Sequence, residues 1–429
     1  MVRRLRILPL LAALGLGGCP RPSVEPRATP TPAPTPTPVP TPTPPPYVPA
    51  KRVDFGKVFN GMQYKVTLET ERGTTATKDR NDPASYTAEV TVKVKVPKPH
   101  RDLAEIAGLN AKLPSLLPLL PQLLERANVS PFFDDIYRLK VADTQTKLNR
   151  LDALLSRANF YDTETILELQ HPETKRRALF VQADMDVDED GSDPERVPVV
   201  DGSSLTFQPF TSYKWARTTD AANAFLAGRE QALEKVKRDL AVAGLTAEKS
   251  KVLKAQMEEL KAEIHSLKTY SFLVGAADPF IVLPFCVVGK KSPFSPSVGD
   301  YCVVASGNTL YPAVVGDVGP TYKMGEASLR LCKEINPRAN SINSATSELK
   351  ITYLVFPGTA DRPFKAPNLE KWRERCAKFV EELGGRSGEL FAWKDITTPP
   401  PPPAVPSPTA PAPASPAPVA SPSPAPALR

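Results

Sequence analysis

Apolar and polar positions change their period several times along the chain, and each change marks a predicted element. Residues 53–69 and 84–96 are predicted to be strands, the second because apolar residues alternate with period two over its second half. Prolines interrupt the leucines between 101 and 128, which predicts short helical pieces. From Phe132 to Ala158 apolar residues recur at helical spacing and predict one helix packed on a core.

A second β-rich region begins near Thr165. Its apolar runs are short and are separated by turn-forming residues, which is typical of buried strands. The strands that this pattern predicts lie at residues 178–181, 280–288, 301–305, 311–315 and 350–356.

Residues 220–268 have a different pattern, rich in Ala, Leu, Glu and Lys. Apolar positions step by three and four, which predicts two helices, with Gly244 as a C-cap and Thr246 as an N-cap between them. We expect a helical hairpin inserted into a β-rich domain and packed as a two-helix coiled coil. It is either an inert insertion or a surface for a partner.

The start of the chain is typical of an exported protein. Basic residues precede an apolar run from Ile7 to Leu16, which is too short to span a bilayer. The run ends in Leu16-Gly17-Gly18-Cys19, which resembles the lipobox of bacterial lipoproteins and predicts lipidation of Cys19. The protein would then be a membrane-anchored lipoprotein facing the periplasm or the cell exterior. The alternative is an ordinary signal peptide with a chance cysteine.

Two proline-rich segments flank the folded part. Residues 20–50 and 399–429 cannot bury a core and are predicted to be disordered, the first as a stalk after a signal peptide at 1–19. Between them we expect an α+β protein, with an N-terminal α/β region at 51–160 and a domain with a β-barrel-like core at 161–398.

Charge and the spacing of cysteines and histidines bear on which partners and cofactors are expected. The formal net charge is +7, but the basic residues are spread along the chain, so a solvated surface is favoured and no nucleic acid is expected. Besides Cys19 there are four cysteines, which allow two disulfides, and Cys286–Cys302 with Cys332–Cys376 is the favoured pairing. Free buried thiols are an equal alternative. No Cys-x-x-Cys or His-x-x-x-His spacing occurs, so no metal and no cofactor is expected.

The first acidic cluster is Asp184, Asp186, Asp188 and Asp190. On a strand the first three share one face. The spacing resembles the start of a calcium loop, but Val197 stands where an EF-hand has glutamate. A solvated acidic turn and an acidic wall of a substrate cleft are the other interpretations.

The second acidic group is Asp317, which follows a predicted strand, and Glu326, placed where a helix is predicted to begin. Two carboxylates in such places are the minimum for glycoside hydrolysis, in which one protonates the leaving oxygen and the other activates water or attacks the sugar. A turn aspartate and a helix-start glutamate are also ordinary structural choices.

Five short blocks together resemble the glycoside hydrolase family 75 chitosanases, first described in fungi, and they occur in the family's order. They are ALFVQADMDVDEDG at 178–191, DPFIVLP at 278–284, AVVGDVGP at 313–320, MGEAS at 324–328 and ITYLVFPG at 351–358.

The resemblance implies endo-hydrolysis of β-1,4-linked glucosamine polymer with inversion at the anomeric carbon. It places the catalytic pair on Asp317, as general base, and Glu326, as general acid. The four acids at 184, 186, 188 and 190 would form the wall that binds the polysaccharide. An inverting pair needs room for water, so carboxyl groups ~6.5–9.5 Å apart are expected.

Three features depart from the family pattern. Fungal members usually have Cys where Glu189 stands, the helical insert is unfamiliar, and residues 51–160 lie outside the resemblance. Two other functions stay open: a non-catalytic carbohydrate-binding or structural lipoprotein, and a hydrolase of another amino-sugar polymer such as partly de-N-acetylated wall glycan.

Overall fold

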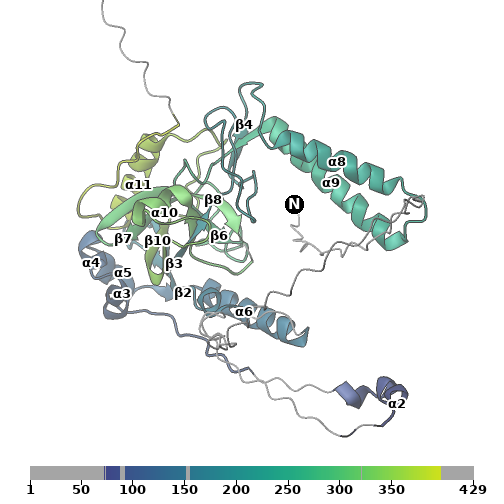
Figure 1. The fold of residues 1–429 in the computed structure, drawn as a ribbon. Helices are drawn as coiled ribbons and strands as arrows, with labels where there is room; N and C mark the ends of the chain where they lie inside the picture. Colours follow the sequence, from purple (N-terminus) through teal and green to yellow (C-terminus); the bar gives the residue numbers. More distant parts are fainter. Residues whose placement is uncertain (1–71, 73, 87–91, 151–154, 320, 398–429) are drawn as a thin grey trace, which may run out of the picture. The chain divides into compact units, whose positions relative to one another are not determined.

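The computed structural model describes residues 72, 74–86, 92–150, 155–319 and 321–397 (Figure 1). These residues belong to one compact unit of the chain, Asp54–Arg429. The predictions for the signal peptide, for Cys19, for the strand at 53–69 and for both proline-rich segments lie outside the described residues.

Six strands close into a barrel, which confirms the predicted core. In the ring, β3 is followed by β10, β7, β8, β6 and β9, and β9 pairs back onto β3 (Figure 1). Strands β1 and β2 extend the sheet from β3, and β4 pairs with β5 in a separate ribbon. The strands are β1 Asn128–Val129, β2 Thr163–Gln170, β3 Arg177–Asp188, β4 Lys214–Ala216, β5 Tyr270–Phe272, β6 Phe280–Pro284, β7 Tyr301–Ser306, β8 Thr309–Gly319, β9 Glu326–Ser328 and β10 Thr346–Val355.

The helices begin where the sequence supplies caps or prolines. Asp102 and Glu105 form a capping box at the start of α3, and α4 and α5 each have proline in the first turn, as the proline-broken pattern predicts. The helical segments outside the insert are α2 Ala76–Asn81, the 3-10 turn η1 Pro83–Tyr86, α3 Leu103–Leu109, α4 Leu113–Leu116, α5 Leu120–Glu125, α6 Pro131–Asn149, α7 Arg157–Phe160, α10 Leu329–Ile335 and α11 Leu369–Leu383.

Two hydrophobic clusters hold these helices on the barrel. In one, α3, α5 and α11 pack on strand residues such as Phe180 and Val303. In the other, α6 and α10 pack on the alternate strand residues, such as Val181 and Val304. The strands are therefore apolar on both faces, which explains their continuous apolar runs.

The predicted helical hairpin is confirmed as α8 Leu226–Leu240 and α9 Ala247–Thr269, which lie side by side (Figure 1). An ion pair of 3.0 Å between Arg229 and Glu263 joins the two helices. Thr246 caps α9 by accepting from the amide of Lys249, as predicted. Gly244 is not the C-cap of α8, because the helix already ends at Leu240 and Gly244 lies in the loop with φ +82°.

Three predicted elements need correction. The single helix predicted from Phe132 to Ala158 ends at Asn149, and Arg157–Phe160 forms the separate helix α7, which Ser156 caps. Within 84–96, the described residues form η1 and then no strand, because the valines from Val92 onward find no partner strand. Glu326 does not begin a helix: it lies in β9, and α10 starts at Leu329 after the N-cap Ser328.

The predicted disulfides are also absent. Cys286, Cys302, Cys332 and Cys376 are all free thiols. The thiol of Cys332 donates to the carbonyl oxygen of Ala327 over 3.4 Å. Cys376 instead donates to the carbonyl oxygen of Cys302 over 3.2 Å.

No helix among the described residues is long and apolar enough to cross a membrane.

A β-bulge in β8 prepares the site. Ile281 of β6 pairs with Val315, but the next residue, Val282, pairs with Asp317, so Gly316 is the extra residue. The bulge reverses the alternation and turns Asp317 onto the face of Val282. Only glycine fits at 316, because an added Cβ would lie 2.5 Å from the ring of Phe280.

We predict that Gly316→Ala lowers the free energy of unfolding by about 1–3 kcal/mol, the cost of overpacking a core. Gly228→Ala is the matched control, since Gly228 lies in the first turn of α8 and an added Cβ would contact nothing within 4 Å. It should raise stability by up to ~1 kcal/mol through helix propensity. Urea unfolding measures both, and equal stability of the two variants would contradict the role of the bulge.

Candidate active site

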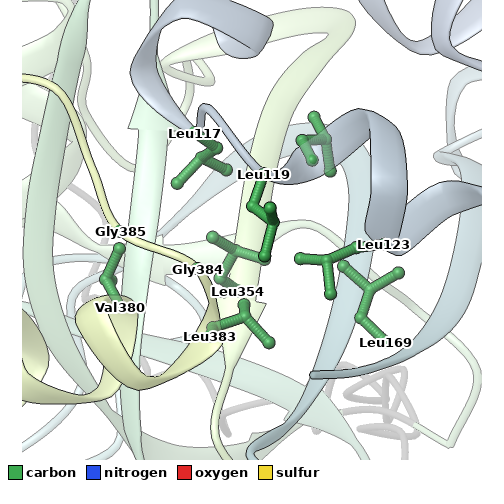
Figure 2. A pocket seen from close by; sticks show the side chains of 10 residues that line it. Leu117, Leu119, Leu123, Leu169, Leu354, Val380, Leu383, Gly384 and Gly385 are labelled. Carbon is green, nitrogen blue, oxygen red and sulfur yellow. The ribbon is translucent and has the colours of Figure 1, made fainter. Parts of the chain in front are cut away.

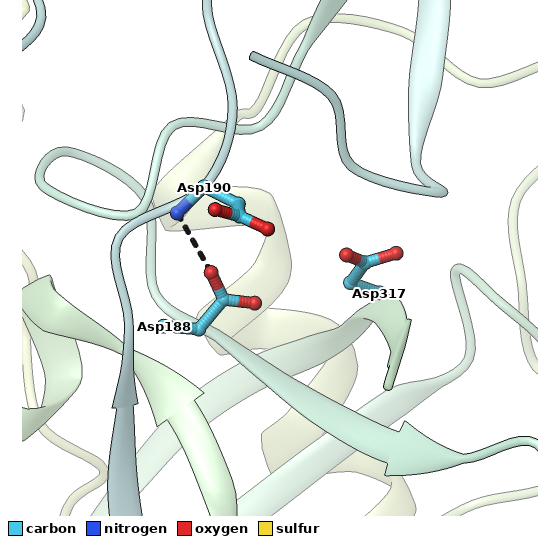
Figure 3. Close-up of side chains that lie close together, drawn as sticks. All are labelled: Asp188, Asp190 and Asp317. Carbon is cyan, nitrogen blue, oxygen red and sulfur yellow. Dashed lines mark hydrogen bonds between the residues drawn. The ribbon is translucent and has the colours of Figure 1, made fainter. Parts of the chain in front are cut away.

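Acidic side chains from β3, the turn after it and β8 meet at one place. Carboxylate oxygens of Asp188, Asp190 and Asp317 all lie within 4.8 Å of one another (Figure 3). The backbone amide of Asp190 donates to Asp188 over 2.7 Å, which folds the turn back on the strand end. Figure 3 shows Asp317 facing this turn from the other side. The structure thus brings residues of the two predicted acidic groups together.

Val282 is the common neighbour of the two predicted catalytic acids. It pairs with Asp317 of β8 on one side and with Glu326 of β9 on the other. Residues opposite each other on adjacent strands project from the same face. With strands about 4.8 Å apart, the two acids stand on backbones about 10 Å apart. This spacing suits carboxyl groups that must leave room for a water molecule.

Asp317 is held by three donors at one oxygen. The backbone amides of Ser212 and Val318 donate to its Oδ1 over 2.8 and 2.7 Å, and the hydroxyl of Ser212 donates to the same atom. The side chain is buried. Donors that converge on one carboxylate oxygen orient the group and stabilise its negative charge.

Glu326 lies in a space that glycine leaves open. A Cβ on Gly319 would lie 3.1 Å from Oε2 of Glu326 and 2.8 Å from Val282. Lys323 is a further neighbour: although burial opposes its charge, the carboxylates of Glu326 and Asp186 raise the pKa of its ammonium group. Its Nζ lies 2.6 Å from Asp186. One cation therefore lies among the acids of β3 and β9.

The pKa of Asp188 is raised by its surroundings in the cluster. Burial raises its pKa well above the ordinary value, and the carboxyl groups of Asp190, Asp317 and Glu326 raise it further. Like charges so close together do not all ionise, so the cluster retains a proton. The same three oxygens of Asp188, Asp190 and Asp317 are those that could hold a divalent cation.

The four acids predicted to bind substrate do not form one wall. Asp188 and Asp190 lie in the cluster with Asp317, and Asp186 accepts from Lys323 and from the hydroxyl of Ser344. Asp184 is buried, and its Oδ1 has no hydrogen-bond partner among the described residues. Its position favours a structural role over contact with a saccharide.

Sequence patterns missed Ser212, Lys323 and Ser344. Ser212 lies in an irregular segment before β4, more than a hundred residues from Asp317, and no local spacing links the two. Lys323 directly precedes the MGEAS block. Of these three residues, it is the one that could have been predicted, as a basic residue close in sequence to Glu326.

The apolar cavity in Figure 2 does not belong to this site. It holds only about 10 Å³ and is lined by leucines, Val380 and two glycines, with no acidic side chain.

We predict that Asp184 makes stability depend on pH. Burial raises its pKa to about 9, and Asp162 and Asp186 add to the rise. The folded state then binds this proton more tightly than the unfolded state, whose pKa is about 3.9, so stability present at acidic pH is lost as the pH rises towards 9. Asp184→Asn removes this loss.

The stability gained by Asp184→Asn over wild type should therefore grow with pH, by up to ~1.4 kcal/mol per unit. Urea unfolding of both proteins between about pH 5 and pH 8 measures it. A difference that stays constant over that range would contradict a buried, protonated Asp184.

Comparison with known protein families agrees with this geometry. Residues 185–392 match the family described as fungal chitosanase of glycosyl hydrolase group 75. A search among curated proteins found no match. The matched segment contains Asp317, Glu326 and three of the four acids of β3 and its turn. Residues 185–392 therefore form a domain of glycosyl hydrolase group 75.

Proposed function

We propose that the protein is an exported chitosanase that hydrolyses β-1,4-linked glucosamine polymer by an inverting mechanism. The family supports a glycoside hydrolase acting on a polysaccharide. The observation that carries the finer proposal is the placement of Asp317 and Glu326 on either side of Val282, on one face of the barrel.

In this mechanism Glu326 protonates the leaving glycosidic oxygen and Asp317 activates water on the opposite face of the sugar. The base role suits Asp317, because three donors at its Oδ1 hold the carboxylate in one orientation and stabilise its charged form. The acid role suits Glu326, because it lies close to Asp188, in a cluster of carboxyls that retains a proton.

Charge supports an amino-sugar substrate. The chain as a whole has a net charge of +7, so it does not attract a polycation from a distance. The cluster of Asp188, Asp190 and Asp317 reverses this sign locally. Ammonium groups of glucosamine units would bind beside these acids, and an uncharged N-acetylated polymer would gain less.

We predict that the purified protein releases reducing ends from chitosan and that Glu326→Gln and Asp317→Asn each lower kcat by ~10²–10⁴-fold. Each substitution keeps the shape of the side chain but removes its proton transfer. Glu348→Gln, at an exposed acid of β10, is the matched control and should retain full activity.

Reducing-end assays and oligosaccharide masses give the rates, and proton NMR of the first product should show the α-anomer. A β-anomer would contradict inversion. Release of oligosaccharides from de-N-acetylated wall glycan but not from chitosan would indicate that the substrate is another amino-sugar polymer. A folded protein without turnover on either would leave a carbohydrate-binding lipoprotein.

We also propose that Cys19 carries a lipid anchor that holds the domain outside the cell or in the periplasm. The support is the sequence Leu16-Gly17-Gly18-Cys19 after a short apolar run, followed by a proline-rich segment. Roughly thirty residues of polyproline II would separate the domain from a membrane by about 90 Å.

The full chain expressed in a bacterium should therefore fractionate with membranes, and Cys19→Ser should release it to the soluble fraction. A single acyl chain anchors weakly whereas two or three anchor stably, so the change should be nearly complete. Identical fractionation of both proteins would contradict lipidation at Cys19.

A further inference from the structure

A lysine and an aspartate form an ion pair in the interior beneath the candidate site. Lys140 of α6 and Asp162, just before β2, are 0% and 1% exposed, and Nζ lies 2.5 Å from Oδ1. Both residues precede position 185, where the family match begins. The pair is therefore a feature of this chain that the family match does not assign.

The pair is fully hydrogen-bonded. Besides Asp162, the ammonium group donates to the carbonyl oxygens of Asn159 and Phe160 over 2.8 and 3.2 Å. The hydroxyl of Thr163 donates to Asp162 over 2.6 Å. Burial lowers the pKa of Lys140 and raises that of Asp162, and the attraction between them opposes both shifts. A buried ion pair of this kind adds little net stability, because the cost of desolvating the two charges offsets their attraction. Its role is therefore to be found in the groups that it holds in place.

Asp162 binds both backbones that flank Glu326. Its Oδ2 accepts from the amide of Met324 over 3.3 Å, and its carbonyl oxygen accepts from the amide of Asp184 over 3.2 Å. The amide of Asp186 also donates to the carbonyl oxygen of Gly325 over 2.7 Å. This bond joins the backbone of β3 directly to the turn before Glu326.

The turn that carries Glu326 has little freedom of its own. Gly325 has φ +75°, and a Cβ there would lie 2.2 Å from Oδ1 of Asp184. The strand that follows, β9, is only three residues long. Its register between β3 and β6 therefore depends on how firmly the turn before it is held.

We propose that the Lys140–Asp162 pair positions Glu326, with Asp162 fixing the turn at Met324 and Lys140 fixing Asp162. This inference rests on the proposed function for the role of Glu326, but the hydrogen bonds that carry it do not. Neither residue of the pair touches the substrate: both are positioning residues, provided by the part of the chain that precedes the family match.

The test compares two double variants that both remove the buried charges. Lys140→Met/Asp162→Asn keeps an oxygen that can accept from Met324, whereas Lys140→Met/Asp162→Leu does not. Removing both charges together avoids an unpaired buried ion, which would destabilise the fold. With chitosan, we expect kcat of the Leu variant to be ~10–100-fold below that of the Asn variant, with KM unchanged, because a misplaced acid slows chemistry without weakening binding.

The remote pair Arg176–Glu382 supplies the control. It lies about 30 Å along β3 from Asp186, and Arg176→Met/Glu382→Gln should leave kcat unchanged. Equal kcat in the two Lys140/Asp162 variants, or a loss of the same size in the control, would overturn the proposal.

Hydrogen exchange in the wild-type protein keeps the inference testable if the Leu variant fails to fold or the proposed function fails. The amide of Met324 should exchange slowly, together with the barrel amides, because Asp162 accepts its proton in the interior. Exchange as fast as that of an exposed loop would overturn the positioning role whatever the enzyme acts on.

Discussion

Carboxyl groups from β3, β8 and β9 gather on one face of the barrel, where burial strengthens the repulsion between them. Much of the surrounding structure offsets that repulsion. Three donors fix one oxygen of Asp317, and Lys323 forms an ion pair with Asp186 and is attracted by the charge of Glu326. Burial and neighbouring carboxyl groups raise the pKa of Asp188. A protein gains little stability from such a cluster. Acid–base chemistry needs one carboxyl charged and another protonated at the same pH, and crowding supplies that asymmetry.

The geometry depends on two glycines that have different roles. Gly316 forms the bulge that turns Asp317 onto the face of Val282, and Gly325 lets the backbone before Glu326 approach Asp184. Deeper in the structure, Asp162 holds both sides of that turn. The segment before the family match thus contributes to the site without supplying a residue that touches the substrate.

Periodicity predicted the barrel strands, the proline-broken helices and the inserted hairpin, because each buries a regular apolar pattern. It failed where pairing decides the structure: the valines near 92–96 have no partner strand, and β9 is too short to carry a pattern. The motifs predicted Asp317 and Glu326, but alternation alone would turn Asp317 to the opposite face. Lys140 could have been noticed in the sequence, because it lies at helical spacing from the apolar residues Phe133, Ile136 and Tyr137. Ser212 could not, because only the tertiary structure brings it to Asp317.

A crystal structure of the Glu326→Gln variant with a glucosamine oligosaccharide would show whether Glu326 and Asp317 flank the bond that is cleaved. We expect the sugar chain to cross β9, β6 and β8 above Val282. The glycosidic oxygen should then lie within hydrogen-bond distance of residue 326, with a water molecule between Asp317 and the anomeric carbon. An oligosaccharide bound elsewhere, or one that lies across these strands with neither residue near a glycosidic bond, would contradict this expectation.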